Sequence, residues 1–207
     1  AEILFEGCRV PKGNLIGQPG EGFLLAQKRL SGGRIHHAMR WISTCQRAFD
    51  MMCERAISRQ MGGRPLSDKQ FVQDFVAASA TEIQAARLLT LHAAWHWDTY
   101  GGSASRVQIA QIKWWGAQVL YNVIDRAIQV HGALGYSTDL PLERMYRTAR
   151  NFRLSDGADE VHKSFIARKV LKEYSPVEGY PSEHVPTRTA EAQARFAEYL
   201  DLAEANL

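Results

Sequence analysis

Apolar side chains recur every three or four positions along three long stretches of this chain, at about residues 23–59, 67–98 and 103–131. This spacing places the apolar side chains on one face of a helix, and that face must be buried against other elements. Glycine-containing breaks separate the stretches, and Ser67 and Ser103 follow these breaks as candidate helix caps. With a fourth helix in two pieces after them, the stretches predict an all-α, antiparallel up-and-down four-helix bundle.

The segments on either side of the predicted bundle have different patterns. Residues 1–10 alternate loosely between apolar and polar side chains, which predicts one short β-strand that needs partner strands for stability. We expect residues 1–22 to be this strand and a connecting loop, and residues 23–174 to form the helical domain. Residues 175–207 contain a linker with prolines and glycine and then an Ala/Glu-rich stretch at 188–205, which predicts a short helical tail.

Composition and charge restrict the possible partners and compartment. The chain has 207 residues, of which 45% are hydrophobic and 23% charged, and a net charge of +3, so charge gives no argument for nucleic acid or membranes. The sequence has no signal peptide and no apolar run of membrane-spanning length. A start at Ala1 and not at Met is compatible with removal of a targeting segment. Cys8, Cys45 and Cys53 form no pairing pattern, so we expect free thiols in a reducing, cytoplasmic compartment.

A carboxylate-rich loop lies between two of the predicted helices. Pro141 suits the first position of a helix, and residues 155–160, Ser-Asp-Gly-Ala-Asp-Glu, precede the next apolar-periodic stretch. A permissive glycine beside acidic side chains is typical of a helix start, where a carboxylate accepts hydrogen bonds from free backbone N–H groups. From these residues alone, capping is the favoured interpretation of Asp156 or Asp159, and a catalytic carboxylate is the alternative.

A series of residues with fixed spacing surrounds this loop. Its members are Gln129, Gly132, Ala133, Gly135, Tyr136, Asp139, Pro141, Glu143, Arg144, Arg147, Ala149, Arg150, Asp156 and Gly157. The series resembles the C-terminal signature of the acyl-CoA dehydrogenase flavoenzymes. Residues 9–11 and 20–23 resemble the passage from the β-domain of that family into its helical domain. Residues 33–40 resemble the branch that carries an aspartate instead of a glutamate as catalytic base.

The resemblance extends over residues 1–174 and implies a function. It implies an FAD-dependent oxidoreductase of fatty acid metabolism that oxidises the CH–CH bond of an acyl-CoA and passes electrons to an electron-transfer flavoprotein or similar acceptor. Family members form homodimers or homotetramers and are normally much longer than this chain. The chain would then be an inactive fragment, with residues 1–22 ending a middle β-domain. Two alternatives stay open: a related acyl-CoA or nitroalkane oxidase, and a non-catalytic helical module that only dimerises.

The resemblance also implies roles for single residues. Asp156 corresponds to the base that removes the α-proton of the acyl-CoA, and Arg34, Ser155 and Gly157 correspond to substrate-binding positions. The FAD-binding positions are Arg59, Gln70, Gln129, Gly132, Ala158 and Glu160. The first four of these contact the adenine and pyrophosphate end of the FAD bound to a neighbouring subunit. The alternatives are an ion pair within the helix for Arg34 and ordinary surface polarity for the FAD-binding set.

Four positions depart from the family pattern. Gly62 stands where an aromatic residue usually faces the flavin, and Ala133 replaces the second glycine of a pair. Thr148 replaces an acidic residue, and Ala158 replaces a hydroxyl side chain at the flavin. We therefore expect flavin contacts that are weaker or rearranged, with activity reduced or absent as the extreme case.

Two pairs of histidines are candidates for metal binding. His92 and His96 lie four positions apart on a predicted helix, a spacing that supplies two ligands on one face. No Glu-x-x-His pair completes a di-iron site of the kind found in helical bundles, so we expect no metal. His36 and His37 are adjacent and face different directions on a helix, which argues against a shared ligand role.

Overall fold

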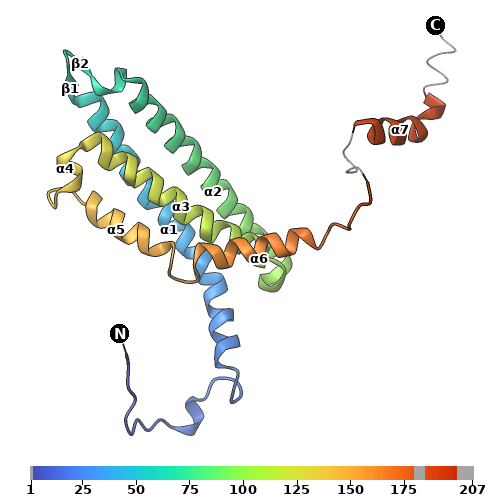
Figure 1. The fold of residues 1–207 in the computed structure, drawn as a ribbon. Helices are drawn as coiled ribbons and strands as arrows, with labels where there is room; N and C mark the ends of the chain where they lie inside the picture. Colours follow the sequence, from blue (N-terminus) through green and yellow to red (C-terminus); the bar gives the residue numbers. More distant parts are fainter. Residues whose placement is uncertain (1, 180–184, 200–207) are drawn as a thin grey trace. The chain divides into compact units, whose positions relative to one another are not determined.

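The computed structural model describes residues 2–179 and 185–199. Three long helices lie side by side and antiparallel (Figure 1), each in contact with the other two. They are α1 (Gly22–Ser58), α2 (Gln70–Ala104) and α3 (Arg106–His131). The fourth helix of the bundle is divided into α4 (Ala133–Tyr136) and α5 (Leu142–Phe152), which both pack against α3. The predicted all-α up-and-down bundle is confirmed.

Short elements join and flank the long helices. The turn between α1 and α2 is an antiparallel hairpin in which Gln60 faces Pro65 and Met61 faces Arg64. The remaining elements are β1 (Gln60–Met61), β2 (Arg64–Pro65), α6 (Asp159–Leu171), α7 (Val185–Arg195) and the 3-10 turns η1 (Lys12–Asn14) and η2 (Leu66–Asp68). The chain divides into two compact units, residues 1–168 and 169–207, and α7 belongs to the second. Of the predicted tail helix at 188–205, residues 200–205 lie outside the described part.

Both predicted serine caps are wrong. Ser67 lies within the 3-10 turn η2, and α2 begins after Lys69. The predicted break after the second stretch is present as a kink at Gly101, with φ 80°, after which the chain resumes helical geometry up to Ala104. Helix α3 therefore starts after Ser105 and not at Ser103, and the Ser105 hydroxyl donates back to the Gly101 carbonyl instead of capping.

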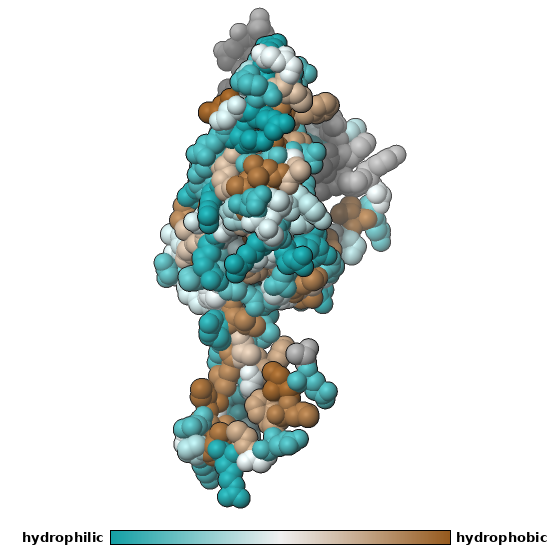
Figure 2. Space-filling view, turned by 90° about the vertical axis from the view of Figure 1, so that its left-hand side faces the viewer, coloured by the Kyte–Doolittle hydropathy of each residue, from teal (hydrophilic) through white to brown (hydrophobic). Residues whose placement is uncertain are grey.

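The predicted N-terminal strand is not formed. Residues 2–10 contain no strand, and β1 and β2 make up the only sheet among the described residues. The physical reason is that this segment finds no partner strand. Figure 2 shows apolar surface uncovered toward the N-terminal part of the chain. The exposed apolar side chains of residues 2–10 are Ile3, Leu4, Phe5 and Val10.

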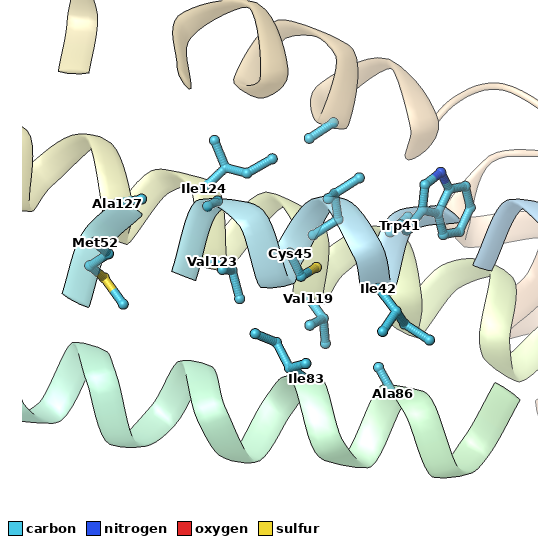
Figure 3. Packing of buried hydrophobic residues seen from close by; sticks show 14 of the residues in the cluster. Trp41, Ile42, Cys45, Met52, Ile83, Ala86, Val119, Val123, Ile124 and Ala127 are labelled. Carbon is cyan, nitrogen blue, oxygen red and sulfur yellow. The ribbon is translucent and has the colours of Figure 1, made fainter. Parts of the chain in front are cut away.

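The core lies between α1, α2 and α3 (Figure 3), where inward-facing side chains from the three helices meet. Small residues let the helices approach: a Cβ added at Gly116 of α3 would lie 3.3 Å from the ring of Trp41 on α1. Full burial of a large apolar side chain stabilises a fold by about 1.5–3 kcal/mol. The buried side chains labelled in Figure 3 are Trp41, Ile42, Cys45, Met52, Ile83, Ala86, Val119, Val123, Ile124 and Ala127.

Candidate functional site

The loop between α5 and α6, residues 153–158, is shaped by two residues with left-handed backbone conformations. Asp156 has φ 56°, a region in which aspartate is several-fold enriched among non-glycine residues. Gly157 follows with φ 100°, and a Cβ at this position would lie 2.9 Å from Nε2 of His162. Glycine is therefore required here by both backbone conformation and space.

Arg34 and His37 of α1 bind this loop at Asp156. The Arg34 guanidinium donates two hydrogen bonds to the backbone carbonyl of Asp156, at 3.1 Å from Nε and 2.8 Å from Nη2. Nε2 of His162 on α6 lies 3.3 Å from the same oxygen. Nδ1 of His37 lies 2.8 Å from the carboxylate Oδ2 of Asp156. The carboxylate thus contacts α1 and not the first turn of α6, so the structure does not support the capping interpretation of Asp156.

The imidazole of His37 is partly buried, which favours its neutral form. Burial lowers the pKa of His37, and Asp156 opposes this shift while Arg40, His36 and Arg29 add to it. An ionised carboxylate can only accept a hydrogen bond, so Nδ1 carries the hydrogen in this contact. The ring also belongs to an aromatic cluster, with centroids 6.0 Å from Trp41 and 6.2 Å from Phe152. Apolar rings therefore line one side of the hydrogen bond to Asp156.

Lys113 of α3 binds the C-terminal end of α5, next to the loop. Its side chain is only 1% exposed, and its Nζ donates to the Phe152 carbonyl at 2.7 Å. Burial lowers the pKa of Lys113, while Asp159 and Asp156 act in the opposite direction. Lys113 is a site residue that the sequence patterns did not predict. The available signal was a lysine four positions after Ile109, on the apolar face of the third stretch.

The two other carboxylates at the loop have different surroundings. Asp159 is 1% exposed and accepts a hydrogen bond from Nε of Arg153 at 2.8 Å, which locks it into a structural ion pair. Glu160 is exposed at the start of α6. Asp156 alone combines partial burial, with 24% of its side chain exposed, and contacts that fix both its backbone and its carboxylate. Ser155, Gly157 and Ala158 are its half-buried neighbours.

Four of the predicted FAD-binding residues lie at the opposite end of the bundle. Arg59 follows the end of α1, Gln70 begins α2, and Gln129 and Gly132 lie at the end of α3, so the antiparallel helices bring them to one end (Figure 1). All four are exposed. Ala158 and Glu160 are not part of this group, because they lie beside Asp156.

A shallow cavity of about 300 Å³ opens near this end of the bundle. Its lining includes Arg55, Ser58 and His131, together with Leu134 and Leu140. Nε of Arg55 is buried and has no hydrogen-bond partner among the described residues. Guanidinium and amide donors of this kind suit phosphate oxygens, so the chemistry of this end fits the pyrophosphate of FAD. The sequence analysis did not include Arg55 in this set.

His92 and His96, the candidate metal ligands, are in contact with other side chains of the protein. The rings of His92 and His96 have centroids 6.0 Å apart, and Nδ1 of His96 lies 2.8 Å from the Ser105 hydroxyl. Within the described ranges no three His, Cys, Asp or Glu side chains come together as metal ligands. Within the same ranges, no helix has the length and apolar character needed to cross a membrane.

Comparisons with known proteins match most of this chain. The family model "Acyl-CoA dehydrogenase, C-terminal domain" matches residues 20–171. A probable acyl-CoA dehydrogenase of Mycobacterium tuberculosis, FadE2, is 48% identical over 170 residues, which cover 82% of this chain and 42% of that protein. The structure of a putative acyl-CoA dehydrogenase from Mycobacterium abscessus matches with a TM-score of 0.74 and 41% identity, covering 76% of this chain and 39% of that one. The butyryl-CoA dehydrogenase structure from Megasphaera elsdenii matches with a TM-score of 0.72 and 30% identity, covering 78% and 42%. The chain thus spans less than half the length of each of these relatives.

Proposed function

Because this chain belongs to the acyl-CoA dehydrogenase family and matches its C-terminal domain, we propose that it is the helical domain of an FAD-dependent enzyme that oxidises an acyl-CoA across its α and β carbons. The observation that carries the proposal is the half-buried Asp156, whose carboxylate is bound by His37 and whose backbone carbonyl is bound by Arg34, both from α1. A general base must be held in place relative to the proton it removes. Asp156 is the carboxylate at this loop that meets this requirement.

In the proposed reaction, Asp156 takes the α-proton of the acyl-CoA. The hydrogen bond from His37 occupies Oδ2, so Oδ1 is the oxygen available for the proton. As the α-carbon loses its proton, the electron pair forms the α,β double bond and a hydride leaves the β-carbon. FAD, when bound, supplies the acceptor for that hydride. The fork of Arg34 on the Asp156 carbonyl fixes the backbone from which the short aspartate side chain reaches the substrate. A displacement of about 1 Å at such a site costs on the order of a hundredfold in rate.

The residues at the far end of the bundle would hold the adenine and pyrophosphate end of FAD. Arg59, Gln70, Gln129 and Gly132 are exposed there, and the unpaired Nε of Arg55 adds a donor nearby. Their separation from Asp156 favours an assembly, a homodimer or homotetramer, in which this end completes the FAD site of a neighbouring subunit. The replacements Gly62, Ala133, Thr148 and Ala158 then predict altered contacts with the flavin.

The other parts of the proposal follow from the family. They are an electron-transfer flavoprotein or similar acceptor and a role in fatty acid metabolism. A cytoplasmic location is supported instead by the free thiols of Cys8, Cys45 and Cys53. The boundaries at 1–22, 23–174 and 175–207 also remain predictions. Acyl chain length stays open because residues outside this chain would form most of the acyl pocket.

The test is anaerobic reduction of FAD by saturated acyl-CoA esters, followed by absorbance in the intact FAD-loaded protein. We expect reduction, and turnover only when an electron acceptor is added. Turnover with oxygen alone would instead favour the oxidase alternative. Loss of the flavin spectrum without any reaction of the acyl-CoA, or no reduction by any ester tested, would favour the non-catalytic helical module.

A further inference from the structure

We propose that His37 is a positioning residue for the base, acting through an Nδ1–H···Oδ2 hydrogen bond that orients the Asp156 carboxylate and directs Oδ1 to the substrate. This inference rests on the proposed function, because it concerns the same carboxylate. The sequence presents His37 only as one of two adjacent histidines, which gives no sign of this role.

The geometry supports a hydrogen bond that orients the carboxylate. Nδ1 and Oδ2 are 2.8 Å apart, and both side chains are largely buried, with 28% of His37 and 24% of Asp156 exposed. The imidazole packs beside the rings of Trp41 and Phe152, which are themselves in contact with centroids 5.1 Å apart. Trp41 is part of the bundle core, so the position of the imidazole is set by the fold and not by the mobile end of a long side chain.

Arg34 and His37 divide the task of holding Asp156. Arg34 binds only the backbone carbonyl, which fixes the loop but leaves the carboxylate free to rotate about its side-chain torsions. His37 binds the carboxylate itself and removes that freedom. Both donors come from one face of α1, a single turn apart, so one rigid element sets the backbone and the reacting group together.

Several charged groups act on this pair, and the role of His37 has to be separated from theirs. A donor to the charged form of a carboxylate favours that form, so losing it makes protonation easier. Asp156 is contacted by Arg34 and His37 from α1 and by His162 from α6, and its charge acts on Lys113 of α3. Asp159 and Glu160 of α6 also act on Lys113, and Arg153 at the end of α5 pairs with Asp159. The groups facing His37 are Asp156, Arg40, His36 and Arg29. Substitution of His37 leaves all the others in place.

Two substitutions separate the hydrogen bond from the packing of the ring. His37→Phe keeps an aromatic ring against Trp41 and Phe152 but removes the donor. His37→Asn removes the ring but keeps an amide N–H at the same number of bonds from the backbone as Nδ1. His36→Phe and His36→Asn are the matched controls, because His36 is the exposed neighbour on the same helix.

The experiment measures kcat/KM for acyl-CoA against pH in the intact FAD-loaded protein, with Asp156→Asn in parallel and FAD content checked for each variant. We expect His37→Phe to lose roughly ten- to hundredfold in kcat/KM, the scale of a charge-assisted hydrogen bond. The acidic side of its pH profile, where kcat/KM falls as pH decreases (the acid limb), should move to higher pH, because the variant's base has lost a hydrogen-bond donor to its charged form. His37→Asn should recover most of the rate and the original acid limb, and the two His36 variants should behave as the parent protein.

Three results would overturn the inference. Normal kcat/KM and an unmoved acid limb in His37→Phe would show that the hydrogen bond is not used. A poor His37→Asn beside a normal His37→Phe would show that packing alone matters. Equal loss in both His37 variants with no change in the acid limb would assign a purely structural role. An active Asp156→Asn would instead refute the base assignment of the proposed function, so the two failures are distinguishable.

Discussion

The two ends of the helical bundle present their polar residues in opposite ways. At the Asp156 end, Arg34, His37, Lys113 and Asp156 are buried or half-buried, and each is engaged by a hydrogen bond within the chain. At the other end, Arg59, Gln70 and Gln129 are exposed, and their side chains form no hydrogen bond or ion pair within the described residues.

The Asp156 end is therefore a site whose contacts are formed within the chain, whereas the other end is a surface whose polar side chains are available to bind a ligand or another subunit. Buried polar groups need partners, so the contacts around Asp156 had to be completed within this fold. The arginine and the amides at the far end have no such need while water solvates them. Substitutions at the two ends should therefore have different consequences: changes near Asp156 alter the reaction or the stability of this fold, and changes at the far end alter binding.

Replacing Asp156 by Asn should have the largest effect. Asn keeps the size of the side chain and tolerates the left-handed backbone at this position. It cannot take the α-proton, and loss of a general base costs roughly 10²- to 10⁴-fold in rate. Single-turnover reduction of FAD by acyl-CoA measures this loss, and thermal unfolding and FAD content should be close to those of the parent protein. Near-normal turnover would place the base elsewhere.

The glycines of the two ends provide the second test. Gly157 and Gly132 both have positive φ, but an added Cβ would meet His162 at 2.9 Å in the first case and open space in the second. A strained backbone of this kind costs about 1–3 kcal/mol. Gly157→Ala should therefore lower the free energy of unfolding by such an amount, and by more than Gly132→Ala, which carries the strain alone. Urea denaturation of both variants measures the difference, and equal losses would mean that the His162 ring yields freely.

Arg59 tests the far end directly. Arg59→Ala removes an exposed guanidinium, so the free energy of unfolding should change by no more than about 0.5 kcal/mol. Loss of a charge-assisted hydrogen bond to a phosphate should weaken FAD binding by roughly tenfold in the intact assembly. FAD release followed by fluorescence measures this effect, with Arg47→Ala on the exposed face of α1 as control. Unchanged FAD affinity would argue against the proposed role of this end.

The sequence predicted most of the fold because helical periodicity is local. The three long helices follow from apolar spacing alone, whereas the strand predicted at residues 1–10 depends on partner strands, and none pairs with it among the described residues. The site was predictable only where a family pattern marked it, as at Asp156 and Arg34, which lie 122 positions apart and meet only in the folded chain. His37 and Lys113 were missed as parts of the site because their importance comes from contacts across helices, which spacing within one helix does not reveal.

The smallest predicted effect concerns pH and His162, which is 6% exposed and lies behind Asp156. Burial lowers the pKa of His162, and Arg34 and Lys113 lower it further, while the contact with the Asp156 carbonyl and the charge of Asp159 oppose the shift. An unfolded histidine has a pKa of about 6.5, so on acidification the unfolded chain binds its proton before the folded chain does. The free energy of unfolding should therefore fall as pH decreases through this value, until the folded histidine is also protonated.

His162→Gln tests this sign. Gln keeps an N–H for the Asp156 carbonyl but cannot be protonated, so the variant should lose less stability than the parent protein between pH 7.5 and 5.5. His37, whose pKa is also lowered by burial, acts in the same direction, so the slope should decrease and not vanish. Urea midpoints across this range measure the slope, with His36→Gln as the exposed control. If the variant and the parent protein had the same slope, His162 would be protonated equally easily in the folded and unfolded chains. The contact between His162 and the Asp156 carbonyl would then be weaker than its geometry indicates.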